Sequence, residues 1–186
     1  VVIFFLVQAI LLVAVVVFRD KPDNPEPKQI HGNTKLELLW TVIPVLILVA
    51  IAIPTVRTIF DLAKEPENAM KVEVVGHQWW FEFKYPQYGI TTANVLIIPA
   101  DKPVRLEMWS NDVMHNFWVP KLNGKRYLVP GQITYLNLYA DNPGEYWAQC
   151  GEYCGLSHSK MRARVISLNS SDFKMLIENE QKEAKR

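Results

Sequence analysis

Two long apolar runs stand apart from the rest of the chain. Val1–Phe18 contains one polar side chain, Gln8, and no charge, and Leu38–Pro54 contains one polar side chain, Thr41, and again no charge. Each run is close to the ~20 residues that a helix needs to cross a bilayer core of roughly 30 Å. Prolines such as Pro44 are tolerated in membrane helices, where neighbouring groups re-satisfy the freed backbone. The pattern therefore predicts transmembrane helices at about 1–18 and 38–54, and not two buried helices of a soluble protein.

The start of the first run and the segment between the two runs indicate how the chain enters the membrane. The first run begins at residue 1 without a methionine or a flanking charge, so we expect the chain to start inside its first helix. No small-residue cleavage site follows Phe18, which argues against a secretory signal. Residues 19–37 form a loop broken by residues that disfavour regular structure, which are Pro22, Pro25, Pro27 and Gly32.

The same loop predicts the orientation of the hairpin. It carries the basic side chains Arg19, Lys21, Lys28 and Lys35. Short loops rich in Lys and Arg stay on the cytoplasmic side of the membrane. We therefore expect residues 1–54 to form a helical hairpin that sends the chain from about Thr55 onward to the outer face.

Beyond the second run, the pattern changes to short segments in which apolar and polar residues alternate. These segments are Lys71–Val75, Phe81–Tyr85, Val95–Ile98, Val104–Met108, Ile133–Leu138 and Met161–Ile166. Turn signals separate them, at Asp101–Lys102–Pro103, Asn123–Gly124, Pro130–Gly131 and Asn142–Pro143–Gly144. Many short strands at this spacing predict an all-β sandwich or barrel over roughly residues 70–168.

The last segment, residues 169–186, predicts a closing helix and tail. Ser171 is a suitable N-cap, and Phe173, Leu176 and Ile177 share one helical face. The whole chain of 186 residues carries a net charge of +1 and is 49% apolar. That balance excludes a strongly basic nucleic-acid-binding protein and an acidic disordered chain.

The residues that carry chemistry are concentrated in one segment. Both cysteines of the chain fall within twelve residues of each other and of other potential ligands, with one histidine further upstream. The set is His115, Cys150, Glu152, Cys154, His158 and Met161. Three simpler interpretations are a disulfide, a structural zinc site made of the two cysteines and two histidines, and a pair of inert buried cysteines. None of these three gives a role to both Glu152 and Met161.

A copper site uses every residue of the set. Soft thiolate and thioether sulfurs together with imidazole select copper, and one Cys, two His and a weak Met form an electron-transfer copper site. Because this chain has one cysteine more than that pattern needs, two thiolates four residues apart can bridge two metal ions. Gly151 and Gly155 give the backbone the freedom to fold tightly between them. The sequence thus favours a two-copper centre that relays electrons.

Four motifs in this order resemble cytochrome c oxidase subunit II. They are Leu36–Glu37–Leu38–Leu39–Trp40–Thr41–Val42–Ile43–Pro44, Gly76–His77–Gln78–Trp79–Trp80, Val129–Pro130–Gly131, and the ligand set that runs from His115 to Met161. The resemblance covers nearly the whole chain. It implies a cupredoxin-like β-sandwich on a two-helix membrane hairpin, with a binuclear copper centre.

The resemblance also implies a role for individual residues. The copper ligands would be the side chains of His115, Cys150, Cys154, His158 and Met161, together with the main-chain carbonyl of Glu152. The Glu152 side chain would help to hold a magnesium ion at the contact with subunit I. Trp79 would receive electrons from the donor, and Glu37 would lie at the mouth of a proton channel. Simpler roles for these last two are an interfacial anchor and a charge that complements a helix dipole.

The family implies function, location and partners as well. The chain would accept electrons from a c-type cytochrome and pass them to haem in subunit I, where oxygen is reduced to water and protons are translocated. It would lie in a bacterial or mitochondrial inner membrane as a multi-pass protein, with the copper domain on the periplasmic or intermembrane face. Subunit I and other oxidase subunits would be its partners, and no nucleic acid.

Two residues depart from the family pattern. Lys84 and Tyr127 stand where many members carry acidic residues of the docking face for cytochrome c. The donor is therefore a soluble, a tethered or a fused cytochrome, and the sequence does not decide among these. Three rival classes are a quinol-oxidising relative, nitrous oxide reductase and a copper chaperone. The complete ligand set argues against the first, the membrane runs against the second, and Trp79 beside bridging thiolates against the third.

Overall fold

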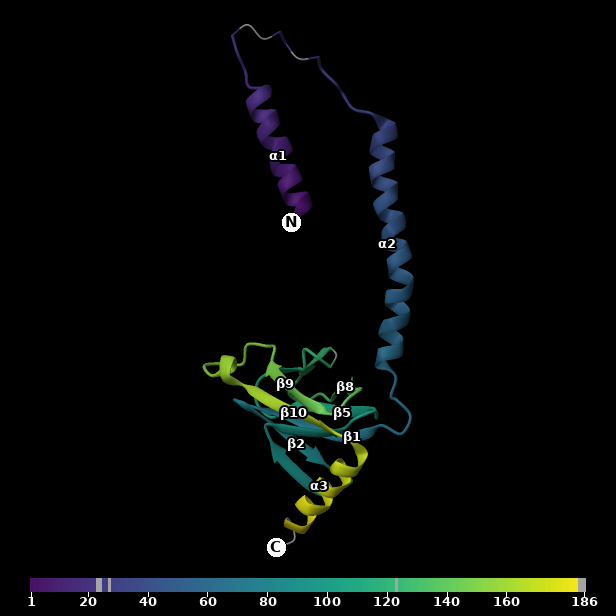
Figure 1. The fold of residues 1–186 in the computed structure, drawn as a ribbon, viewed down its shortest axis with the longest axis vertical. Helices are drawn as coiled ribbons and strands as arrows, with labels where there is room; N and C mark the ends of the chain where they lie inside the picture. Colours follow the sequence, from purple (N-terminus) through teal and green to yellow (C-terminus); the bar gives the residue numbers. More distant parts are fainter. Residues whose placement is uncertain (23–24, 27, 123, 184–186) are drawn as a thin grey trace. The chain divides into compact units, whose positions relative to one another are not determined.

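The chain divides into two compact units, Val1–Ala50 and Ile51–Arg186. The computed structural model describes residues 1–22, 25–26, 28–122 and 124–183. Pro27 of the predicted loop and Asn123 of one predicted turn lie outside the described residues. Figure 1 shows two helices in the first part of the chain, followed by a β-sandwich and a last helix.

The two N-terminal helices follow the apolar runs. Helix α1 spans Val2–Val17, and α2 spans Thr34–Ala63. Of the described helices, α2 alone is long and apolar enough to cross a membrane, whereas α1 is a shorter apolar helix of 16 residues. The Asn33 side chain caps α2 by accepting hydrogen bonds from the N–H groups of Lys35 and Leu36 at 3.1 and 3.3 Å. At 1.5 Å per residue α2 is about 45 Å long, so it extends beyond the apolar run at both ends.

The rest of the chain forms two five-stranded sheets. The first sheet has the order β3 (Ile90–Ala93), β2 (Trp80–Tyr85), β1 (Met70–His77), β5 (Val104–Ser110) and β8 (Thr134–Leu138). The second has the order β4 (Val95–Pro99), β10 (Arg162–Leu168), β9 (Gly144–Cys150), β6 (His115–Trp118) and β7 (Lys125–Leu128). Strands β1 and β5 pair in parallel, as do β4 and β10, and the other pairs are antiparallel.

An aromatic cluster joins the two sheets. Alternate residues of β2 are buried, which is the period of a strand with one face in the core. Phe81 and Phe83 from the first sheet contact Phe117 of the second edge-on, with ring centroids 5.2 and 5.7 Å apart. Such contacts combine a large buried apolar area with a preferred ring geometry. They fix β6, the strand that begins at His115, against the first sheet.

Helix α3 (Ser170–Glu183) closes the sandwich. Phe173 and Ile177 are buried as predicted, but the N-cap is Asn169 and not Ser171. The Asn169 side chain accepts a hydrogen bond from the N–H of Asp172 at 2.9 Å, whereas the Ser171 hydroxyl bonds to Asn169 itself. An amide side chain at the cap satisfies the free N–H groups of the first turn.

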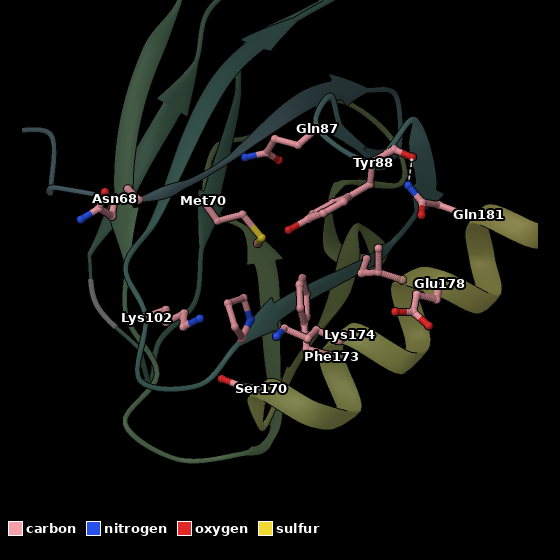
Figure 2. Close-up of a pocket in the computed structure, with 13 residues that line it drawn as sticks. Asn68, Met70, Gln87, Tyr88, Lys102, Ser170, Phe173, Lys174, Glu178 and Gln181 are labelled. Carbon is pink, nitrogen blue, oxygen red and sulfur yellow. Dashed lines mark hydrogen bonds between the residues drawn. The ribbon is translucent and has the colours of Figure 1, made fainter.

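A pocket of about 450 Å³ lies between α3 and the sandwich (Figure 2). Met70, Tyr88 and Phe173 supply apolar walls, and the charged residues that line the pocket are Lys102, Lys174 and Glu178. The Gln181 amide donates a hydrogen bond to the Tyr88 carbonyl at 2.9 Å. None of the residues that line this pocket belongs to the cysteine segment, so the pocket and the candidate metal site are separate features.

Candidate metal centre

Two adjacent strands and one returning loop bring the cysteine segment together. Cys150 ends β9 and pairs with Phe117 of β6, two residues after His115. The chain then folds back, because the N–H of Cys150 bonds to the Met161 carbonyl at 3.0 Å and the N–H of Gly151 bonds to the Asn116 carbonyl at 2.9 Å. The start of the loop is therefore held by backbone hydrogen bonds to β6 on one side and to Met161, at the end of the loop, on the other.

All six predicted ligand atoms lie close together. The two cysteine sulfurs are 3.9 Å apart. Cys150 Sγ lies 3.9 Å from His115 Nδ1 and 3.2 Å from the Glu152 carbonyl. Cys154 Sγ lies 3.6 Å from His158 Nδ1 and 3.7 Å from Met161 Sδ. Each sulfur thus has one imidazole nitrogen and one further donor atom beside it.

The separation of the two sulfurs excludes a disulfide in this structure. A disulfide requires about 2.05 Å between its sulfur atoms, and both cysteines are free thiols. Both are buried, as are His115 and Met161. Buried thiols beside a buried histidine are a set of donors in an environment from which water is largely excluded.

The electrostatics of the pair favour one thiolate and oppose the second. Burial opposes ionisation of Cys150, but hydrogen bonds with His115 and with the backbone of Asn116 and Glu152 lower its pKa to about 6. Burial, and then the charge on Cys150, raise the pKa of Cys154 to about 12. Two thiolates this close are stable only with a cation between them, because metal ions replace the protons of their ligands.

A carboxylate outside the ligand set orients His115. Asp112 Oδ1 lies 2.7 Å from His115 Nε2, which leaves the other ring nitrogen, Nδ1, facing Cys150. Burial opposes the charge on Asp112, but its bonds to His115 and to the backbone N–H groups of Gln78 and Val113 hold its pKa below the usual value. Burial also opposes charge on His115, and its bonds to Cys150 and Asp112 raise its pKa. Such outer partners fix the tautomer of a metal-binding histidine.

Trp79 contacts the metal loop directly. Its indole Nε1 donates a hydrogen bond to the Cys154 carbonyl at 3.2 Å, and the neighbouring Gln78 amide donates to the same oxygen at 2.8 Å. The side chain is 36% exposed, so the ring contacts both the solvent and the ligand loop. Gly155 allows this approach, since its φ is +117° and a Cβ there would lie 3.3 Å from the Trp79 ring.

Not every predicted functional residue joins the cluster. Glu37 lies in the first turn of α2, in the other compact unit. Sequence reasoning also missed two residues, Asp112 and Gln78. Asp112 could have been suspected from its position three residues before His115, but Gln78 reaches the loop only through the fold, from 76 residues away.

The donors present suit a soft transition metal. His115, Cys150 and Cys154 place their ligand atoms within 4.8 Å of one another, and His158, Met161 and the Glu152 carbonyl border the same two sulfurs. Two thiolates, two imidazoles and a thioether form a set that selects copper over hard cations. The fold and the site therefore define a membrane-anchored metalloprotein with a cupredoxin-like sandwich.

Comparisons with known proteins agree with this class. Residues 1–58 match the family described as cytochrome c oxidase subunit II, transmembrane domain, and residues 89–168 match its periplasmic domain. The chain belongs to the cytochrome c oxidase subunit II family. It is 40% identical over 179 residues to cytochrome c oxidase subunit 2 of Alkalihalophilus pseudofirmus, which is 92% of this chain and 52% of the relative.

Other relatives widen the comparison. The chain is 34% identical over 189 residues to quinol oxidase subunit 2 of Bacillus cereus, which is 98% of this chain and 64% of the relative. The chain thus spans about half to two-thirds of the length of these relatives. The crystal structure of the periplasmic domain of cytochrome oxidase subunit II of Bradyrhizobium japonicum has the same fold, with a TM-score of 0.61 and 22% identity. That alignment covers 63% of this chain and 97% of the other.

Gly76 gives a direct test of the support for His115. A Cβ at this position would lie 2.7 Å from His115 Cδ2 and 3.2 Å from Leu128 Cδ2, so the ring has to move. We expect Gly76→Ala to lower copper affinity about tenfold, as changes that disturb the orientation of a ligand do. The loss of stability should be about 1–3 kcal/mol, the cost of overpacking a core. Copper titration and thermal unfolding of the purified chain measure the two effects.

Gly144→Ala is the matched control for this substitution. A Cβ there meets only Tyr146, at an ordinary 3.7 Å, so copper affinity should stay unchanged. Wild-type affinity in Gly76→Ala would contradict the inference that β1 holds His115 in place.

Proposed function

We propose that this chain is the subunit of a membrane-bound haem–copper oxidase that accepts electrons from a c-type cytochrome and passes them to haem in subunit I. The oxygen-reducing site, and the proton translocation coupled to it, would belong to the complex and lie on another subunit. The observation that carries the proposal is the group of four donor atoms around the two cysteine sulfurs, with an exposed tryptophan bonded to the same loop.

The ligand residues would have defined tasks. Cys150 and Cys154 would bridge two ions, and each sulfur already has a histidine nitrogen beside it, from His115 and His158. Met161 and the Glu152 carbonyl would complete the set. A pair of copper ions held by these donors would supply one-electron redox chemistry. The Glu152 carboxylate would be free to help hold a magnesium ion at the contact with subunit I.

The candidate copper ligands distinguish this proposed function from quinol oxidation. Quinol oxidase subunits are among the relatives, so the family alone does not decide the electron donor. The five side chains proposed to bind copper are all present in this chain and lie close to one another. This convergence supports copper-mediated transfer from a cytochrome, because a quinol-oxidising subunit has no use for the set.

The membrane part would set the orientation of the complex. The basic loop between α1 and α2 supports a cytoplasmic position for that loop, with both α1 and α2 crossing the membrane. This arrangement makes the chain a multi-pass protein of a bacterial or mitochondrial inner membrane, with the copper domain on the outer face. Glu37, in the first turn of α2, would then lie on the opposite side from the copper domain, at the mouth of a proton channel.

The surface near the ligand loop supports docking through apolar contact. Several large side chains around the loop are exposed, and these are Trp79, Val113, Met114, Tyr153 and Leu156. Lys84, in the place of a family acidic residue, lies 3.6 Å from Glu82 and so neutralises one of the remaining carboxylates. The proposed donor, whether soluble, tethered or fused, would therefore rely little on charge attraction.

Salt dependence tests this docking mode. We expect the association rate of a c-type cytochrome to fall only a few-fold between low and physiological salt, because electrostatic steering scales with charge complementarity. Lys84→Glu should raise the low-salt rate and steepen the dependence. Stopped-flow measurement over a salt series gives the slope. A steep fall for the wild-type protein would contradict the apolar docking surface.

The function itself is tested by rapid mixing of the assembled oxidase with a reduced cytochrome. The proposal expects electrons to appear first at the copper site of this chain and then at haem. Reduction of haem by quinol, with the copper site bypassed, would favour the quinol-oxidising alternative.

A further inference from the structure

A second site is present in the unit formed by residues 51–186, far from the cysteine segment in sequence. A groove of about 490 Å³ lies where the last turns of α2 meet β7 and β8. One wall consists of the apolar α2 residues Ile59, Leu62 and Ala63. The other contains the basic residues of the sandwich, Arg105, Lys125 and Arg126. None of the ten lining residues is acidic. The groove therefore combines an apolar wall with three positive charges.

Arg105 is the most informative of these charges. Its side chain is only 8% exposed, and its guanidinium lies over the Tyr135 ring, 4.4 Å from the centroid. Nη1 donates to Asn137 Oδ1 at 2.9 Å, but the buried Nε has no hydrogen-bond partner among the described residues. No carboxylate of the described residues forms an ion pair with it. A buried arginine without a counter-charge is costly, which favours the binding of an anion beside it.

The fold supplies only partial compensation for that charge. Asn137 Nδ2 donates to the carbonyls of Leu62 and Lys64, at 2.9 and 2.7 Å, and so caps the C-terminal end of α2. The end of a helix carries a partial negative charge, which stabilises cations nearby. The acidic residues next along the chain are occupied: Asp61 pairs with Lys64, and Glu65 pairs with Lys71. Asp61 and Glu65 are therefore paired with lysines and not with Arg105.

The position of the groove along α2 indicates a source for such an anion. About 20 residues cross the hydrocarbon core, so a span that begins at Leu38 ends near Arg57. At 1.5 Å per residue, Ile59 to Ala63 lie roughly 3–9 Å beyond it. The headgroup layer on each side of a bilayer is about 5–8 Å thick by the same dimensions. The groove is therefore at the depth of lipid headgroups.

We propose that this groove binds an anionic phospholipid of the leaflet at the C-terminal end of α2. The headgroup phosphate would accept hydrogen bonds from the guanidinium of Arg105 and from Lys125 and Arg126, which line the groove. Arginine matches the planar, bidentate recognition of a phosphate, and the first acyl carbons would pack against Ile59 and Leu62. The lipid would tie the sandwich to the membrane surface and hold it in one orientation. This role is independent of the metal centre and of the electron donor.

Lipid titration of the full chain in detergent micelles tests the proposal. Native mass spectrometry with phosphatidylglycerol and with phosphatidylcholine compares an anionic and a zwitterionic headgroup on the same acyl chains. We expect at least about tenfold tighter binding of phosphatidylglycerol. The double variant Lys125→Gln/Arg126→Gln should weaken that binding about tenfold or more, since each hydrogen bond to a charged group contributes enough for such a change.

The matched control removes two charges elsewhere. Lys174→Gln/Lys182→Gln neutralises two exposed lysines of α3 and should change affinity less than about twofold, because exposed charges away from a ligand contribute little. Equal binding of the two lipids, or equal losses in the groove and control variants, would overturn the proposal. Competition by millimolar inorganic phosphate that displaces the lipid fully would instead assign the groove to a free anion.

The role of Arg105 itself is tested by measuring lipid affinity and thermal stability in the same variant. Arg105→Gln should lose affinity for phosphatidylglycerol about tenfold while the chain gains or keeps its thermal stability, because an unpaired buried charge is removed. Unchanged lipid affinity in a folded Arg105→Gln chain would contradict the role of this arginine. If the variant does not fold, the Lys125 and Arg126 double variant decides the question.

Discussion

Replacing Cys150 or Cys154 with serine is expected to abolish the two-copper centre, lowering copper affinity by more than about 100-fold. The reason is chemical, since a hydroxyl is a hard donor that does not bridge copper ions as a thiolate does. Each sulfur also has its own imidazole within 3.9 Å, so loss of either sulfur separates a histidine from its ion. Copper content after dialysis, together with the spin-resonance spectrum, measures the effect.

Met161→Leu is the matched variant for these cysteine substitutions. Axial thioethers tune the redox potential of such sites more than they hold the metal. Met161 Sδ lies 3.7 Å from Cys154 Sγ, so we expect this variant to retain copper and to change only potential and rate. Either serine variant with two coppers and a mixed-valence signal would contradict the bridging role.

Trp79→Ala should slow reduction of the copper centre by cytochrome about thirtyfold and leave copper content unchanged. An aromatic anchor at the centre of an interface contributes ~2 kcal/mol or more, which is about thirtyfold in rate or affinity. The Trp79 side chain is 36% exposed and its indole bonds to the Cys154 carbonyl, but it is not among the proposed ligands. Trp147→Ala, at an exposed tryptophan of β9, is the control. Rapid-mixing kinetics resolve copper reduction from haem reduction.

Glu37→Gln is the second variant of that experiment, and it tests proton uptake where Trp79→Ala tests electron entry. If Glu37 belongs to a proton channel, copper reduction stays fast and only the later, proton-coupled step at the haem–copper centre slows. Copper reduction at the normal rate in Trp79→Ala would remove the electron role from that residue. Full turnover in Glu37→Gln would leave it as a charge that complements the start of α2.

The outline of the fold followed from hydrophobic periodicity. All six segments predicted as strands overlap observed strands. Alternation is clearest in β2, where one face lies in the core, whereas β4 is buried at four successive residues. The strands that were missed are β3, β6, β7 and β9. In β6 the first three residues are buried, and in β7 three of four are exposed, so neither alternates. Edge position and the metal site override the pattern there.

The helices show the same distinction between local signals and context. Composition located the apolar part of α2, but its ends depend on the cap at Asn33 and on the polar residues beyond Pro54. For α3, the apolar face was predicted correctly and the cap was displaced by two residues. Ser171 and Asn169 are both good caps by residue type, and only the hydrogen bonds distinguish them.

The grouping of the candidate ligands could be predicted because five of the six residues lie within twelve positions of the sequence. The supporting contacts could not, since they join distant segments. Gln78 reaches Cys154, and Gly76 makes room for His115, only after β1 and the returning loop have packed together. The burial of Arg105 without a counter-charge could not be predicted either, because an arginine on a strand is normally exposed.

Metal analysis of the purified full chain distinguishes a two-copper centre from a mononuclear site. We expect two copper ions per chain and a spin-resonance spectrum in which one unpaired electron is shared by two copper nuclei. A single bound ion, whether zinc or copper with a one-nucleus spectrum, would contradict it. That result would show that the two thiols of Cys150 and Cys154 do not bridge a metal pair.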